Sequence, residues 1–346
     1  MKKRLINIEL IRVIAIIMVI IIHVSNIYFY SFNKISSYNF LYSVIYNSFA
    51  RVCVPLFFMI SGIFLINSEY SLKKYFKRIG KYILLLIIWS FIYYLINNNF
   101  HFNNFGFVLI NSLFNASMTS RHLWFLYAII GIYIALPFIQ NMCKNLNREH
   151  ENLFLILWIT FSGLIVVIVP ISRFITNSNI DISYPIPIIN ATYYLGYFIS
   201  GHILYKRFNE IKSTKKINLM LLIMFLISSF ITILITYYVS ITTNTIFDSM
   251  TWYRSIFIIM ASFAFFGMVV INKDKIKSEF ILKLSKYSFG IYLIHMIFLN
   301  ILKDNYDLLQ FNSFLAIFSV TFIIYFISLV SCVIIGKIPI LKKIIF

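Results

Sequence analysis

The stretch I8-E-L-I-R12-V-I-A-I-I-M-V-I-I-I-H23 places ten apolar residues between an arginine and a histidine. Such a run is typical of a membrane-spanning helix, in which a charged side chain costs about 2.5–3.5 kcal/mol on insertion scales. Eleven helical residues turn through ~1100°, close to three full turns, so Arg12 and His23 share one face and lie ~16 Å apart along the axis. Glu9, three residues before Arg12, extends the same polar stripe. The stripe therefore predicts a functional site along this helix.

The whole chain has the composition of a membrane protein. Hydrophobic residues make up 61% and charged residues 12%, against about 25% charged in a soluble domain, and the mean hydropathy is +0.87. The three cysteines form no paired pattern, and no nucleotide-binding loop or zinc-protease motif occurs. We therefore expect an all-α polytopic helical bundle in the lipid bilayer, with no disulfide framework and no metal site.

Ten apolar segments approach the ~20 residues that a bilayer requires, which predicts about ten transmembrane helices. The longest connection between them, 97–121, is expected at the membrane interface. No connection exceeds about 25 residues, so 1–346 is predicted to be a single membrane-embedded domain without a soluble one. The ten segments are 9–30, 41–66, 82–97, 122–140, 152–170, 188–205, 217–239, 252–272, 281–301 and 312–336.

Lysine and arginine are distributed unevenly over the connections. With the N-terminus in the cytoplasm, 24 of the 30 basic residues fall on the cytoplasmic side, as the positive-inside rule requires. Both termini are therefore predicted to be cytoplasmic. The formal net charge of +19 follows from this topology, so no nucleic-acid partner is expected.

Four blocks in order, taken together, resemble the acyltransferase-3 family, whose members are membrane O-acyltransferases that modify cell-envelope glycans. The resemblance runs from residue 8 to about 300 and implies a stand-alone membrane domain in a bacterial plasma membrane. It implies transfer of an acyl group, acetyl by default, from cytoplasmic acyl-coenzyme A to a hydroxyl of an envelope saccharide or lipid-linked glycan. The blocks are the Arg-x10-His stretch, A50-R51-V-C-V-P55-L-F-F-M-I-S61-G62, H122-L-W124-F-L and S288-F-G-I-Y292-L-I-H295.

Under this resemblance His23 and Arg12 are the expected catalytic residues. Histidine is the natural base near neutral pH and would take the proton of the acceptor hydroxyl. Arg12, near the cytoplasmic end of its helix, suits a phosphate-rich donor such as acyl-coenzyme A, and Arg51 would stabilise developing oxyanion charge. The further substrate-binding candidates are Glu9, Ser61, His122, Trp124, Tyr292 and His295.

Each candidate also has a structural interpretation, which the sequence leaves open. These interpretations are snorkelling to the interfaces for Arg12 and Arg51, close helix packing for Ser61 and Gly62, a tolerated kink at Pro55, an aromatic-belt anchor for Trp124, and an interhelical hydrogen bond for Tyr292 and His295.

Two other classes of protein stay open: a non-enzymatic exporter or flippase of a glycan, and a membrane-bound binding module or sensor. Glu9 is the only carboxylate predicted within a span, whereas ion-coupled transporters usually place carboxylates at mid-membrane. An exporter or flippase needs a polar passage through the membrane but no single indispensable base. A sensor needs a soluble output domain. The stripe from Arg12 to His23 therefore favours an enzyme.

Overall fold

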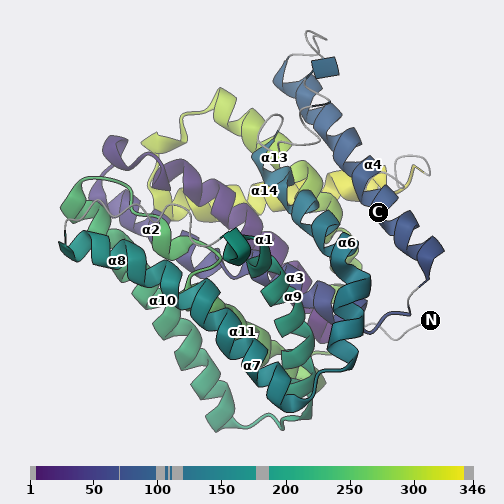
Figure 1. The fold of residues 1–346 in the computed structure, drawn as a ribbon. Helices are drawn as coiled ribbons and strands as arrows, with labels where there is room; N and C mark the ends of the chain where they lie inside the picture. The colour runs from purple at the N-terminus through teal and green to yellow at the C-terminus, as the bar shows by residue number, and fades with distance from the viewer. Residues whose placement is uncertain are drawn as a thin grey trace.

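The computed structural model describes residues 5–69, 71–98, 106–107, 110, 120–176 and 187–338. Within these ranges the chain is helical and contains no strand, which confirms the predicted all-α class. The helices (Figure 1) are α1 (Ile6–Phe29), α2 (Ser37–Ala50), α3 (Cys53–Ile66), α4 (Leu72–Asn97), α6 (Trp124–Lys144), α7 (Arg148–Trp158), α8 (Ile165–Thr176), α9 (Pro187–Glu210), α10 (Lys215–Thr243), α11 (Ile256–Ile271), α12 (Glu279–Ser285), α13 (Ser288–Asn305) and α14 (Ser313–Ile335).

Every predicted segment is helical in the structure. About ten transmembrane helices were expected; among the described residues, eight helical segments are long and apolar enough to cross a membrane, and the bent pair of α12 and α13 makes a ninth. Two of these spans are composite: α2 continues into α3, and α7 continues into α8 through a π-helical stretch at Ile159–Leu164. The remaining segment, 188–205, lies in α9, which packs against α3 and α11. The protein is therefore a polytopic membrane helical bundle.

The outer faces of the bundle are apolar, as contact with lipid tails requires. On α10 and α14, large hydrophobic side chains are exposed along the length of the helix, in a pattern that a water-soluble surface rarely shows. Helices with such long exposed apolar faces are typical of membrane spans. The exposed side chains on these two helices include Leu219, Ile223, Phe230, Leu234, Leu315, Phe318, Phe322 and Phe326.

The predicted limits of the third segment need correction. It was expected at 82–97, but α4 begins at Leu72 and includes the basic stretch that follows. Hydropathy misses this start because lysine and arginine are good helix formers, so a helix continues through them. Most of the 97–121 connection, predicted at the interface, lies outside the described residues.

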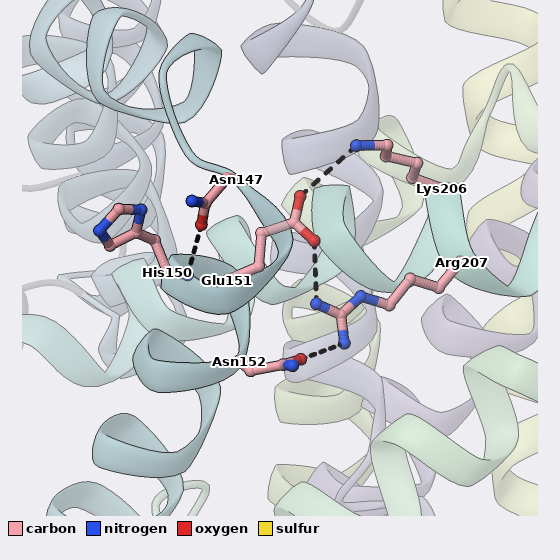
Figure 2. Close-up of polar contacts among 6 residues, drawn as sticks. All are labelled: Asn147, His150, Glu151, Asn152, Lys206 and Arg207. Carbon is pink, nitrogen blue, oxygen red and sulfur yellow. Dashed lines mark hydrogen bonds and ion pairs between the residues drawn. The ribbon is translucent and has the colours of Figure 1, made fainter.

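The prediction that Glu9 is the only carboxylate within a span is wrong. Glu151 lies in the first turn of α7 and is buried against α9 (Figure 2). Its carboxylate is 2.9 Å from Arg207 Nη2 and 3.6 Å from Lys206 Nζ, and Arg207 Nη1 donates to the Asn152 side chain at 2.7 Å. A buried charge needs such partners, because leaving water without them is very costly. The pairing joins the ends of α7 and α9.

The central helix of the bundle is α1, which packs against α2, α3, α11, α12, α13 and α14. Figure 1 shows it crossing the middle of the molecule. Its last turn is bonded to the chain just before α14, where Tyr28 Oη donates to the Leu308 carbonyl at 2.5 Å. The first and last helices are therefore antiparallel neighbours, so the start of α1 and the end of α14 lie on the same side of the bundle.

Two local features position the cavity walls. The span formed by α2 and α3 is interrupted at Arg51 and Val52, because Pro55 has no N–H to donate to the Arg51 carbonyl four residues earlier. The α3–α9 contact is close because it is made by glycines. An added side chain at Gly62 would overlap the Phe198 carbonyl, and one at Gly201 would overlap the backbone of α3. Gly62 thus has the packing role expected of a small residue in a membrane helix.

Candidate active site

A cavity of about 510 Å³ lies beside α1. Along this helix its lining begins at Glu9 and ends at Asn26, with Arg12 and His23 between them. These positions cover ~25 Å of helix, most of a ~30 Å hydrocarbon core. The cavity is therefore long enough to hold an extended chain parallel to α1.

The four sequence blocks converge on this cavity. They reach it from α1, from the α2–α3 junction, from the turn that precedes α6, and from α13. The ninth predicted site residue, His295, does not line the cavity and is fully buried beside it. The eight that line it are Glu9, Arg12, His23, Arg51, Ser61, His122, Trp124 and Tyr292.

Three histidines from three different helical elements form a cluster at this site. The ring centroids of His23 and His295 are 5.2 Å apart, those of His122 and His295 are 5.3 Å apart, and those of His23 and His122 are 6.4 Å apart. His295 Nδ1 lies 2.7 Å from the Tyr292 carbonyl and 3.0 Å from the Ile291 carbonyl. Carbonyls only accept hydrogen bonds, so Nδ1 carries the proton and Nε2 is left as an acceptor.

The Nε2 atoms of His122 and His295 are buried without a hydrogen-bond partner among the described residues. Such unpaired polar atoms are rare in protein interiors and commonly mark a functional site or an ordered water. His122 is held from two directions: its Nδ1 lies 2.6 Å from Ser120 Oγ, and its carbonyl accepts from Tyr292 Oη at 2.7 Å. The interhelical hydrogen bond expected as the structural role of Tyr292 is therefore present, and it fixes a cavity histidine.

Arg51 is tied to α1 through an amide. Its Nε donates to Asn47 Oδ1 at 2.7 Å, and Asn47 Nδ2 donates in turn to Asn26 Oδ1 at 2.8 Å and Ser25 Oγ at 3.1 Å. The guanidinium carbon lies 5.6 Å from the ring centroid of Tyr253, within the range of a cation–π interaction. Arg51 is only 9% exposed, so it belongs to the cavity wall and does not snorkel to the membrane surface.

The opposite end of the cavity contains the charged start of α1. Arg12 Nη1 is paired with Glu9 Oε2 at 2.5 Å, and its guanidinium lies 5.9 Å from the ring centroid of Phe64 on α3. Ser61 lines the same cavity, but its hydroxyl donates to the Phe57 carbonyl of its own helix at 2.8 Å. This back-bonding is the ordinary behaviour of a serine in a membrane helix.

Several residues of the site were not predicted: Asn26, Tyr253 and Lys286 line the cavity, and Asn47 holds Arg51 beside it. Asn26 follows His23 by three residues and Asn47 precedes Arg51 by four, so helical spacing alone could have identified both. Tyr253 reaches the cavity from the connection that precedes α11, and Lys286 reaches it from the α12–α13 bend. Nothing in their local sequence indicates this.

Comparison with known proteins assigns the family. A family model described as "Acyltransferase domain" matches residues 5–337. Over 152 residues the chain is also 32% identical to a protein of Enterococcus faecalis described as an "Amino-acid racemase"; this match covers 41% of the chain and 20% of that protein, so the chain spans only a small part of this relative. No solved structure matches. Because the family match covers nearly the whole chain, this multi-pass membrane protein belongs to the acyltransferase-3 family.

Proposed function

We propose that the protein transfers an acyl group, acetyl in the simplest case, from cytoplasmic acyl-coenzyme A to a hydroxyl of an extracytoplasmic envelope saccharide or lipid-linked glycan in a bacterial plasma membrane. The observation that supports this most is the single cavity that joins Glu9 and Arg12 to His23 and Arg51. One end of the cavity has cations suited to an anionic donor, and the other has imidazoles suited to proton transfer. The ~25 Å of α1 that the cavity follows leaves room for an extended acyl-bearing arm.

The proposed reaction is a substitution at the thioester carbonyl. The acceptor oxygen attacks the carbonyl carbon while His23 takes the hydroxyl proton, and the carbon–sulfur bond then breaks. The sulfur leaves with the proton from His23 as coenzyme A, so an ester and a free thiol are formed. Arg51, held by Asn47, is a fixed cation for the negative charge that develops on the carbonyl oxygen. The unpaired Nε2 atoms of His295, an acceptor, and of His122 lie in the same cluster and help to keep the His23 ring and the incoming hydroxyl oriented.

Arg12 has a different part in this scheme. Eleven residues of α1 separate it from His23 by ~16 Å, so it does not reach the reacting atoms and acts instead on the donor. Among the described residues, the cavity is lined by the cations Arg12, Arg51 and Lys286 and by a single carboxylate, Glu9. This positive balance attracts an anionic donor.

The acceptor is proposed to bind against an aromatic wall. Trp124 stacks on Tyr194, with ring centroids 5.0 Å apart, and lies 6.1 Å from the ring of Tyr253. Flat aromatic faces beside the histidines suit a sugar ring. An exporter or flippase is less well supported, because a passage for a glycan needs no base, whereas this cavity brings His23 and His122 together with Arg51.

The test uses membranes that contain equal amounts of folded protein and receive acetyl-coenzyme A with a labelled acetyl group. The alkali-labile label in the saccharide fraction is measured. His23→Ala should lower it by about 10²–10⁴-fold, the usual effect of losing a general base. His150→Ala is the matched control, since His150 is exposed and points away from α9 (Figure 2). Equal labelling by His23→Ala and the unaltered protein would contradict the assignment of the base.

A further inference from the structure

The bend between α12 and α13 opens onto the cavity. The first helix ends at Ser285, the second begins at Ser288, and their axes differ by 54°. Ser285, Lys286 and Ser288 all line the cavity, as does Arg12. Because α1 packs against both α12 and α13, the bend lies alongside the polar stripe of α1.

The start of α13 provides unpaired backbone donors at this bend. The first amides of a helix have no intrahelical acceptor, and the aligned peptide dipoles place roughly half a positive charge there. α13 is 18 residues long, and its N-cap residue, Tyr287, makes no side-chain capping hydrogen bond. A helix start of this kind is suited to binding an anion.

Ser288 supplies an independent indication of a ligand. It is 1% exposed and lines the cavity, yet its hydroxyl has no hydrogen-bond partner among the described residues. A buried hydroxyl without a partner is unfavourable, so the site is incomplete without a bound group that accepts from it. The exposed side chain of Lys286, two residues earlier, adds a cation at the same place.

The bend is also correctly placed with respect to the histidines. Ser288, Tyr292 and His295 follow one another at helical spacing, so they share one face of α13. Ser288 lies ~10 Å along the axis before His295. An anionic group held at the bend and a long arm extended along this face would therefore bring the end of the arm to the cluster of His23, His122 and His295.

We propose that the α12–α13 bend binds the phosphate groups of the acyl donor, through the first amides of α13, the Ser288 hydroxyl and the side chains of Lys286 and Arg12. This inference rests on the proposed function and names the part of the donor that is recognised and the residues that recognise it. The phosphates stay at the bend while the arm that bears the thioester enters the cavity.

The test compares two acetyl donors on the full chain in phosphatidylcholine vesicles. Acetyl-coenzyme A carries the phosphates, and S-acetylpantetheine has the same thioester and arm without them. For acetyl-coenzyme A, Lys286→Ala and Ser288→Ala should each raise KM about tenfold with kcat retained, the loss expected for one hydrogen bond to a charged group. For S-acetylpantetheine both variants should match the unaltered protein. The matched control, Lys283→Ala, changes the same charge on an exposed residue of α12 that does not line the cavity.

An unchanged KM for acetyl-coenzyme A, or an equal rise for both donors, would overturn the phosphate site. Equilibrium binding of labelled coenzyme A to the same variants separates this inference from the proposed reaction, because it needs no transfer. About tenfold weaker binding by Lys286→Ala supports the site even if no acceptor is ever acylated. Binding of labelled phosphatidylglycerol in mixed vesicles is measured as well. If Lys286→Ala binds this lipid more weakly but keeps its affinity for coenzyme A, the bend holds a lipid headgroup and the donor assignment is overturned.

Discussion

Arg51 is a buried cation whose position depends on one amide. Asn47 accepts from Arg51 Nε and donates to Asn26 and Ser25 on α1, so the guanidinium is held between two helices. A buried charge is tolerated only when its donors are satisfied. The same bonds fix the direction in which the cation faces the cavity, which is what stabilisation of a developing oxyanion requires.

Removal of this amide should affect catalysis through Arg51. Asn47→Ala leaves Arg51 Nε unpaired, at a cost of about 1–3 kcal/mol in the free energy of unfolding, and we expect kcat for acyl transfer to fall about tenfold with KM for the donor little changed. Combined with Arg51→Lys, the two losses should be strongly non-additive, because both act on one interaction. Kinetics of the two single variants and the double variant measure this, with the exposed Asn33→Ala as control. Additive losses would show that Asn47 does not act through Arg51.

Individual site residues were predictable to different degrees. Glu9, Arg12 and His23 follow from helical spacing within one apolar helix, and all three line the cavity. His295 was predicted as a site residue from its sequence block, and its ring centroid lies 5.2 Å from that of His23. Lys286 contributed only to the assignment of the cytoplasmic side. Its proximity to the cavity depends on the bend between α12 and α13, which hydropathy does not detect.

At the scale of helices, the α3–α9 contact determines how closely two walls of the bundle approach. Gly62 faces the Phe198 carbonyl and Gly201 faces Met59, with no space for a Cβ at either position. In lipid, where hydrophobic association between helices is weak, such close backbone contact is a main source of packing energy. Ser61, next to Gly62, lines the cavity, so this contact also sets the shape of the site.

Gly62→Ala should therefore destabilise the protein. The added methyl would overlap backbone that cannot rotate away, and overpacking of this kind costs about 1–3 kcal/mol in the free energy of unfolding. The melting temperature in detergent should fall, and transfer activity with it. Gly131→Ala on α6 is the matched control, because a Cβ there meets nothing within 4 Å. An equal melting temperature for both variants would show that α3 and α9 do not pack in this way.

The sequence predicts which segments form helices better than it predicts where the helices end or which residues of different helices contact each other. Bilayer thickness imposes a minimum apolar length, so the sequence locates the eight or nine helices that are long and apolar enough to cross a membrane, and it also marks 188–205, which is helical but not counted among them. The early start of α4 at Leu72 could not be predicted, because a basic stretch can be helical or irregular, depending on its surroundings. The burial of Glu151 depends on Lys206 and Arg207, which are more than fifty residues away in the sequence and meet it only in the folded bundle.

At the scale of the whole molecule, the two ends of the cavity correspond to the two sides of the membrane predicted from the charge distribution. Arg12 and Lys286 are on the side predicted to be cytoplasmic, while Arg51 and Trp124 belong to the opposite half. The cavity between them follows ~25 Å of α1, so an extended acyl arm can run along it. In the proposed reaction the acyl group alone crosses the membrane, and the rest of the donor stays in the cytoplasm.

The most direct test of this proposal is a comparison of sealed membrane vesicles of opposite orientation, each supplied externally with labelled acetyl-coenzyme A. The coenzyme A released and the label transferred to saccharide are both measured. Inside-out vesicles, which expose Arg12 and Lys286, should consume the donor, and right-side-out vesicles without internal donor should not until they are made permeable. His23→Ala vesicles of either orientation should be inactive. Efficient use of external acetyl-coenzyme A by sealed right-side-out vesicles would contradict a cytoplasmic donor and with it the transfer of the acyl group through this cavity.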